Sequence, residues 1–207
     1  MHPSDTTSPV ALVGRVAAAL LVMGCSPAGR AADHAAASPV LARGEPLILR
    51  EYDGEHRRRR PPPGALSTLG APFILKIDRR NGGAPEFVML AEDIPPGQAI
   101  ALHHHPHSDE ILFIHAGTGL ASLGGRQAVV TSGATIYMPR NTVVGLRNTG
   151  TEPLKIIGIF SRPGFEGYLR EISVPEGQTP APLTVDELEA IRSRHLGTVM
   201  YERARPD

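Results

Sequence analysis

The 207-residue chain has little that would support a disulfide framework or a nucleic-acid surface. It contains one cysteine, so no disulfide can form within it. It has no tryptophan, and aromatic residues make up 4% of the sequence, which argues against a surface that stacks bases. Lysine plus arginine and aspartate plus glutamate both number 21, so no net charge attracts nucleic acid or an anionic membrane. We therefore expect a small molecule, and no nucleic acid, as the partner.

Long apolar runs are also missing, apart from one near the start of the chain. Val16–Gly24 is apolar over nine residues, which is too short to cross a bilayer but typical of a signal-peptide core. The only cysteine, Cys25, follows it directly, and the sequence VMGC resembles the cleavage box of bacterial lipoproteins. We therefore expect residues 1–24 to be a signal peptide and Cys25 to be lipidated in the cell envelope, with that lipid as the only membrane contact. Ordinary secretion and a leader in a cytosolic protein are the alternatives.

Glycine and proline are abundant, at 22 and 20 residues, and favour many turns between short strands. Residues 25–46 are rich in Ala, Gly, Pro and Ser without an apolar period, which predicts a flexible tether. We expect a β-barrel over 47–175 and a helical extension over 176–207. The apolar segment 46–52 is strand-like. Four consecutive arginines and a proline triplet follow it within 55–64. We expect this segment to be a solvated loop; the alternative is that the arginines bind an anionic partner.

Nearly every segment between Ala71 and Ser161 is a short β-type run bounded by turn residues. Nine such runs, spaced at roughly ten residues and without a helical period, indicate an antiparallel sandwich or barrel. The runs expected as strands are 72–78, 86–93, 98–105, 110–116, 119–123, 127–131, 134–139, 142–148 and 154–160.

Two helical patterns follow the last of these runs. The first, at 162–172, has an apolar face. The second, at 183–197, begins with a capping box of Thr184 and Glu187 and ends before a glycine. We expect its apolar stripe to pack against the outside of the barrel: Val185, Leu188 and Ile191.

Five of the nine histidines fall within thirteen residues, from His103 to His115. Side chains alternate across a strand, so His103 and His105 share one face while His104 points the other way. The turn that follows reverses the chain, and an antiparallel hairpin would bring Glu110 beside His105. Two imidazoles and one carboxylate on a concave β-surface suit Fe(II), Mn(II), Zn or Ni, and ligand type alone does not choose among them.

The other histidines of the cluster have different expected places. Strict alternation sends His115 to the outer face of its strand. His107 lies in the turn, where it either lines the mouth of a pocket as an acid–base group or is solvated. The alternative for the whole cluster is a metal-free polar group whose histidines hydrogen-bond to Glu110 and water.

The spacing of the cluster resembles the first motif of the cupin family. Gly97, five residues, His103, one residue, His105, four residues, Glu110, six residues and Gly117 match that motif at each defined position. The resemblance, to a small single-domain bacterial cupin of the quercetin-dioxygenase-like type, implies an all-β fold. That fold is a double-stranded β-helix (jelly-roll) barrel, here with one or two short C-terminal helices, and its conical mouth holds the site.

The second motif of the family is incomplete in this chain. Gly133, Pro139 and Asn148 match it, and Asn141 replaces a glycine, which is tolerable because asparagine also accepts a positive φ. Val144 stands where the family has a histidine, its fourth metal ligand. The resemblance therefore implies a metal held by the three ligands of the first motif alone.

Two functions of different classes fit these observations. In the first, a divalent metal (Fe, Mn, Ni or Zn) bound by His103, His105 and Glu110 acts on a small molecule in the barrel. Dioxygenase, isomerase and decarboxylase chemistry all suit the family, with His107 as an acid–base group at the rim. In the second, the barrel binds a small molecule with neither metal nor turnover. Homodimer formation is compatible with both functions. No nucleophile elbow or phosphate loop offers a competing mechanism.

Overall fold

The computed structural model describes residues 44, 46–64, 70–83 and 86–202. The expected signal peptide, Cys25 and nearly all of the expected tether lie outside these residues. In the part of the chain that is described, neither helix has the length and apolar character needed to span a membrane.

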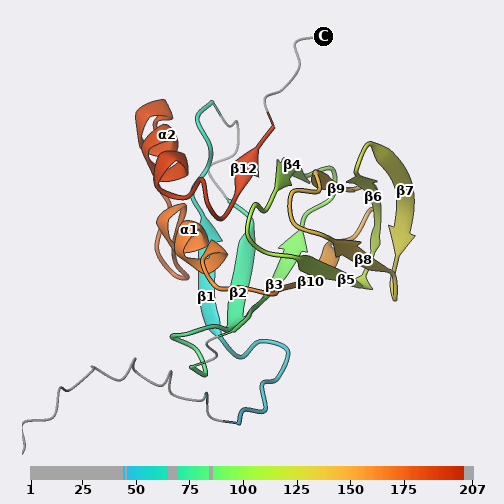
Figure 1. Ribbon diagram of the computed structural model, residues 1–207, viewed down its shortest axis with the longest axis horizontal. Helices are drawn as coiled ribbons and strands as arrows, with labels where there is room; N and C mark the ends of the chain where they lie inside the picture. The colour runs from blue at the N-terminus through green and yellow to red at the C-terminus, as the bar shows by residue number, and fades with distance from the viewer. Residues whose placement is uncertain (1–43, 45, 65–69, 84–85, 203–207) are drawn as a thin grey trace, which may run out of the picture. The chain divides into compact units, whose positions relative to one another are not determined.

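The described elements are mostly short strands, with two helices near the C-terminal end (Figure 1). In chain order they are β1 (Glu55–Arg59), β2 (Pro72–Ile77), β3 (Val88–Ile94), β4 (Ala99–His104), β5 (Glu110–Ala116), β6 (Thr118–Leu123), β7 (Arg126–Thr131), β8 (Thr135–Met138), β9 (Val144–Asn148), β10 (Leu154–Phe160), α1 (Phe165–Glu171), β11 (Ser173–Pro175), α2 (Val185–Arg194) and β12 (Met200–Tyr201).

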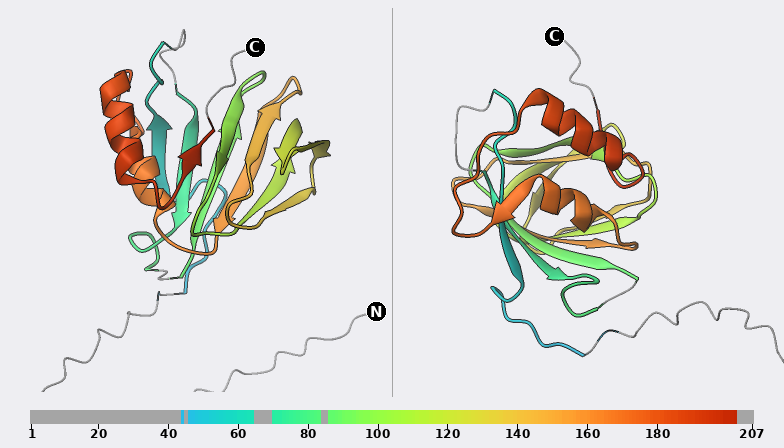
Figure 2. Two further views of the ribbon diagram at one scale, coloured as in Figure 1. Left: turned by 45° about the horizontal axis from the view of Figure 1, so that its top comes forward. Right: turned by 90° about the vertical axis from the view of Figure 1, so that its left-hand side faces the viewer.

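The strands form two sheets whose described pairings are all antiparallel (Figure 2). One sheet has the order β11-β1-β2-β3-β10-β5-β8, and the other has the order β12-β4-β9-β6-β7. From β3 to β10 the chain alternates between the sheets, except that the consecutive strands β6 and β7 form a hairpin within one sheet, and apolar side chains of both sheets share one buried cluster. The expected all-β double-stranded β-helix is confirmed.

All nine runs expected as strands between Ala71 and Ser161 are strands, β2 to β10. Strict alternation is clearest in β3, where every second residue is buried because one face of the strand lines the interior. Val88, Leu90 and Ile94 occupy that inner face. Glu92 occupies it too, so a carboxylate points into the barrel.

Two expectations about the segment before β2 are wrong. Residues 46–52 form no strand, and the arginine run expected as a solvated loop instead forms β1, which pairs with both β2 and β11. The arginines fit into a sheet because their guanidinium groups find acceptors. Arg57 donates to Glu55 and to Ser173, and Arg59 donates to Glu92. Buried charges that are paired in this way are compatible with a strand, whereas unpaired ones are not.

The expected helix start at Thr184 is confirmed. The Thr184 side chain accepts a hydrogen bond from the backbone N–H of Glu187 at 3.1 Å, and the Glu187 carboxylate accepts one from the backbone N–H of Thr184 at 2.8 Å. This capping box fixes the first turn of α2.

The expectation that α2 packs on the outside of the barrel is wrong. Ile191 of α2 and Leu169 of α1 are buried in the same cluster as Phe73 of β2 and Leu90 of β3, whose side chains lie on the inner face. Val185, at the start of the expected apolar stripe, is 57% exposed. The helices therefore cover the open side of the barrel, beside β1 and β2 (Figure 2).

The turn residues of the two motifs behave as their chemistry requires. Asn141 has a φ of 63°, which confirms that this asparagine accepts the left-handed conformation. Gly117 has a φ of 91°, and a Cβ there would lie 2.9 Å from the Cα of Leu154. The Asn148 side chain is buried and donates to the carbonyls of Ile94 and Glu152.

Candidate metal centre

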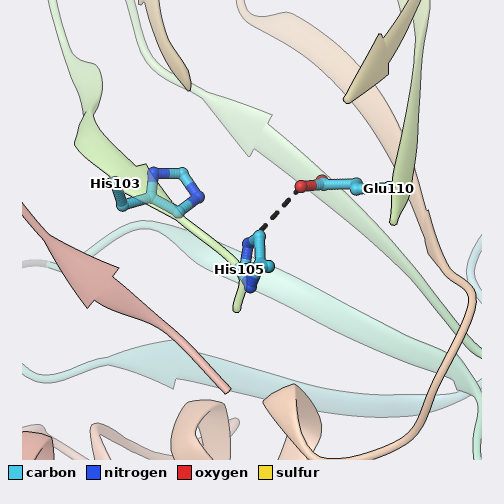
Figure 3. Close-up of side chains that lie close together, drawn as sticks. All are labelled: His103, His105 and Glu110. Carbon is cyan, nitrogen blue, oxygen red and sulfur yellow. Dashed lines mark ion pairs between the residues drawn. The ribbon is translucent and has the colours of Figure 1, made fainter. Parts of the chain in front are cut away.

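His103, His105 and Glu110 converge in the interior, as the spacing predicts (Figure 3). His103 lies on β4, His105 follows directly after β4, and Glu110 opens β5. All three are buried, and each offers a ligand atom within 4.8 Å of the other two. The expectation that the hairpin brings Glu110 beside His105 is confirmed, because His105 Nε2 lies 3.5 Å from Glu110 Oε2.

Backbone carbonyls fix the orientation of both imidazoles. His103 Nδ1 lies 2.8 Å from the carbonyl oxygen of Ala101, and His105 Nδ1 lies 2.7 Å from that of Thr198. A carbonyl only accepts hydrogen bonds, so each Nδ1 carries the hydrogen and each Nε2 keeps its lone pair. Metal-binding histidines are commonly held in this way, with one ring nitrogen donating to a carbonyl and the other facing the ion.

The lone pair of His105 has no hydrogen-bond partner in the described structure. Its Nε2 atom is fully buried and unsatisfied, because 3.5 Å to the Glu110 carboxyl is longer than a normal hydrogen bond. A buried polar atom without a partner costs free energy, so it points to a group that completes the site. The donor set of two imidazoles and one carboxylate fits a divalent transition metal.

Burial favours the neutral form of each of these side chains. Burial and, to a smaller extent, the nearby charge of Glu92 together raise the pKa of Glu110 to about 8. Burial lowers the pKa of His105 to about 4, with a smaller contribution from His103. Burial also lowers the pKa of His103. Both imidazoles are therefore neutral at pH 7 and ready to act as ligands, while Glu110 must lose a proton to become one.

Aromatic side chains pack against the His105 ring. The His105 ring packs edge-on against Phe160 and Phe165, with centroids 5.1 and 4.7 Å away. A cavity of about 510 Å³ is lined by His103 and Glu110 and otherwise mainly by apolar side chains from both sheets and both helices, Phe160 and Phe165 among them. Two of the three candidate ligands, His103 and Glu110, thus lie in the wall of a cavity that could hold a small molecule, and His105 lies directly beside them.

Three other histidines of the cluster lie away from this group. His104 points to the opposite side of β4, where its Nδ1 is 3.3 Å from a Glu202 carboxylate oxygen. His115 is exposed on the outer face of β5, as expected from alternation. His107 is exposed in the turn and is not among the residues that line the cavity. The structure therefore does not bring His107 to the three candidate ligands.

Val144 is buried and lines the cavity opposite His103. It is the cross-strand partner of His103 in the β4–β9 ladder, so an apolar side chain borders the candidate ligands on this side.

Sequence reasoning missed two residues beside the site, Arg59 and Glu92. They line the same cavity, and their bidentate ion pair has N–O distances of 2.6 and 3.2 Å. The signal that could have found them is the acidic residue at an inward position of β3, because a buried carboxylate requires a cationic partner.

The comparisons with known proteins identify part of the chain. The model of the cupin domain matches residues 91–160. An uncharacterized protein of Methanocaldococcus jannaschii is 44% identical over 69 residues, which are 33% of this chain and 55% of that protein. Mannose-1-phosphate guanylyltransferase 2 of Escherichia coli O157:H7 is 32% identical over 68 residues, or 33% of this chain and 14% of that enzyme. The chain thus spans about half or less of these relatives.

Solved structures with a similar fold include two small proteins that the chain covers almost entirely. A predicted oxalate decarboxylase from Thermotoga maritima has a TM-score of 0.49 at 17% identity, covering 56% of this chain and 100% of that one. An RmlC-like cupin from Shewanella frigidimarina has a TM-score of 0.46 at 13% identity, covering 61% of this chain and 99% of that one.

Proposed function

Because this chain carries a cupin domain, we propose that it binds a divalent metal through His103, His105 and Glu110 and acts on a small molecule in the cavity. The observation that carries the proposal is the buried Nε2 of His105, which faces Glu110 and has no hydrogen-bond partner. Fe, Mn, Ni and Zn all accept this donor set.

Each residue of the site has a distinct task in this proposal. The two imidazoles present Nε2 lone pairs, which the carbonyls of Ala101 and Thr198 keep in place. Glu110 gives up its proton and supplies the negative charge. Phe160 and Phe165 pack edge-on against the His105 ring and so hold its plane in position. A bound divalent ion would supply a Lewis acid and a template for the substrate.

For the reaction itself, we propose oxidoreductase chemistry of the dioxygenase type. Three protein ligands leave coordination positions open for O₂ and substrate. Val144, which we propose occupies the place of the fourth family ligand, keeps one of these positions free of protein. The mainly apolar cavity limits the access of bulk water to the open positions.

The alternative is a metal-free cupin that binds a small molecule without turnover. Two observations favour it: the apolar Val144 beside His103, and a Glu110 carboxyl whose pKa of about 8 keeps it protonated at pH 7. Both weaken the retention of a cation.

Metal content separates the two functions. The protein, purified without chelator, is analysed for Fe, Mn, Ni and Zn beside His105→Ala and the matched control His115→Ala, whose side chain is exposed on the outer face. A stoichiometric metal in the wild type and in His115→Ala, lost in His105→Ala, supports the metal-dependent function. Wild-type protein that neither contains nor takes up any of the four metals supports the alternative.

Residues outside the described part carry a separate proposal about location. We propose that the chain is exported and anchored to the cell envelope by a lipid on Cys25, on the strength of the apolar run and the VMGC sequence. Metabolic labelling with a radioactive fatty acid tests this: wild-type protein should incorporate label, and Cys25→Ala should not.

The homodimer is a further proposal, which rests on the family resemblance. A gel-filtration mass that equals one chain would contradict it.

A further inference from the structure

Arg192 of α2 lines the same cavity, and its charge is not balanced by a carboxylate in the described structure. Its Nε atom is fully buried and has no hydrogen-bond partner among the described residues. The guanidinium carbon lies 4.7 Å from the centre of the Tyr201 ring, in a cation–π arrangement. That contact orients the guanidinium but uses none of its N–H donors.

The other two arginines in the cavity wall already have partners. Arg59 donates to both carboxylate oxygens of Glu92. Arg60 donates to Glu187 and to two backbone carbonyls. Arg192 therefore provides the excess positive charge of the described lining and a fully buried N–H donor without a partner, and an anionic group of a ligand would satisfy both.

Tyr201 connects this arginine to the candidate metal centre. The Tyr201 ring contacts the Arg192 guanidinium, and its centre lies 5.7 Å from that of the His103 ring. Since both side chains flank one tyrosine and both line the cavity, a single small molecule can contact Arg192 at one point and lie against His103 at another.

We infer that Arg192 recognises the carboxylate of an amphipathic ligand, a monocarboxylic acid whose apolar chain or ring fills the rest of the cavity. This deepens the proposed function, because it assigns a ligand class to the same cavity. The planar guanidinium matches a carboxylate in size and geometry. The remaining lining is mainly apolar, and about 510 Å³ is enough for a small organic molecule. Among the described arginines that line the cavity, only Arg192 lacks a carboxylate partner, so one guanidinium matches the single charge of a carboxylate better than the double charge of a phosphate dianion.

Octanoate and octanamide, which share an apolar chain and differ in charge, test the inference. Binding of each is measured by titration calorimetry to the full chain, both as purified and after EDTA treatment. We expect octanoate to bind roughly 10- to 100-fold more tightly than octanamide, because a charged hydrogen bond distinguishes the two. The preference should persist after EDTA treatment, since Arg192 acts without metal.

Three variants locate this preference. Arg192→Met keeps the apolar stem and should bind both probes with similar affinity, while Arg192→Lys should keep part of the preference. The control is Arg194→Met on the same helix, whose guanidinium is exposed and pairs with Glu171 outside the cavity, and it should behave like the wild type.

Several outcomes would overturn the inference. Equal affinity of the two probes for the wild type, or no binding of either, excludes a carboxylate site. An octanoate preference that survives Arg192→Met but disappears with EDTA assigns the carboxylate to the metal. That last result would exclude Arg192 as the carboxylate-binding residue but would still agree with the proposed metal-dependent function.

Discussion

His103 and Val144 are cross-strand partners in the β4–β9 ladder, and both line the cavity. In an antiparallel pair, directly opposed side chains lie on the same face with Cβ atoms about 5 Å apart. A metal-binding side chain at position 144, in place of the valine, would therefore lie beside His103. Valine offers no ligand atom, so the candidate metal centre comprises three side chains that could hold a metal, all from one hairpin.

Val144→His should increase metal retention. The new imidazole would add a fourth ligand on the strand opposite His103, so we expect the dissociation constant for Zn²⁺ to fall at least roughly tenfold, as changes around metal ligands typically do. Competition with a chromophoric chelator measures it. Val129→His, on the exposed side of β7, serves as the matched control and should leave the affinity unchanged. Equal affinities in all three proteins would show that position 144 does not border the metal.

The metal-free protein should lose stability as the pH rises from 6.5 to 8. The folded Glu110 carboxyl has a pKa of about 8 against an ordinary value of 4.5, so above pH 4.5 the unfolded state releases this proton first. His105 opposes this effect below pH 6.5, because its folded pKa of about 4 lies under the ordinary 6.5 and stability rises through that range. Above pH 6.5 only the Glu110 effect remains, on the order of 2 kcal/mol.

Urea denaturation of EDTA-treated protein at pH 6.5 and pH 8 measures this loss. Glu110→Gln removes the ionisable group while keeping the shape of the side chain, so its stability should change much less between the two pH values. An equal loss in the wild type and in Glu110→Gln would show that another group causes it.

Arg59→Met should destabilise the fold by about 3 kcal/mol. It would leave the Glu92 carboxylate, which is 5% exposed, without its cationic partner inside the barrel. Lys155→Met breaks an ion pair with the exposed Glu51 and should cost less than about 1 kcal/mol. Denaturant unfolding at pH 7 compares the two variants.

The double variant Arg59→Met with Glu92→Leu completes the test of that pair. It should recover a large part of the lost stability, because it removes both buried charges. No recovery would mean that the two side chains do not act as a pair.

Ile191→Ala and Val185→Ala on α2 should differ strongly. Ile191 is 5% exposed and packs on the inner face of the barrel, so its truncation should cost about 2–4 kcal/mol. Val185 is 57% exposed, so its truncation should change the free energy of unfolding by about 0.5 kcal/mol or less. If α2 packed on the barrel through the whole predicted stripe, the two losses would instead be similar.

The amino-acid sequence by itself determined the local part of the candidate site. Alternation along β4 places His103 and His105 on one face and His104 on the other, and the short turn brings Glu110 beside them. Both effects depend only on residues close together in the chain. The same holds for β2 to β10, whose apolar runs and turn residues mark them clearly.

Only the tertiary structure decided what surrounds that site. The acceptor of the His105 Nδ1 hydrogen is the carbonyl of Thr198, 93 residues later in the sequence. The ion pair between Arg59 and Glu92 stabilises the arginine run as a strand. The packing of α2 on the inner face places Arg192 in the cavity wall. These contacts join distant segments, and their free energy depends on burial and charge pairing that no local pattern contains.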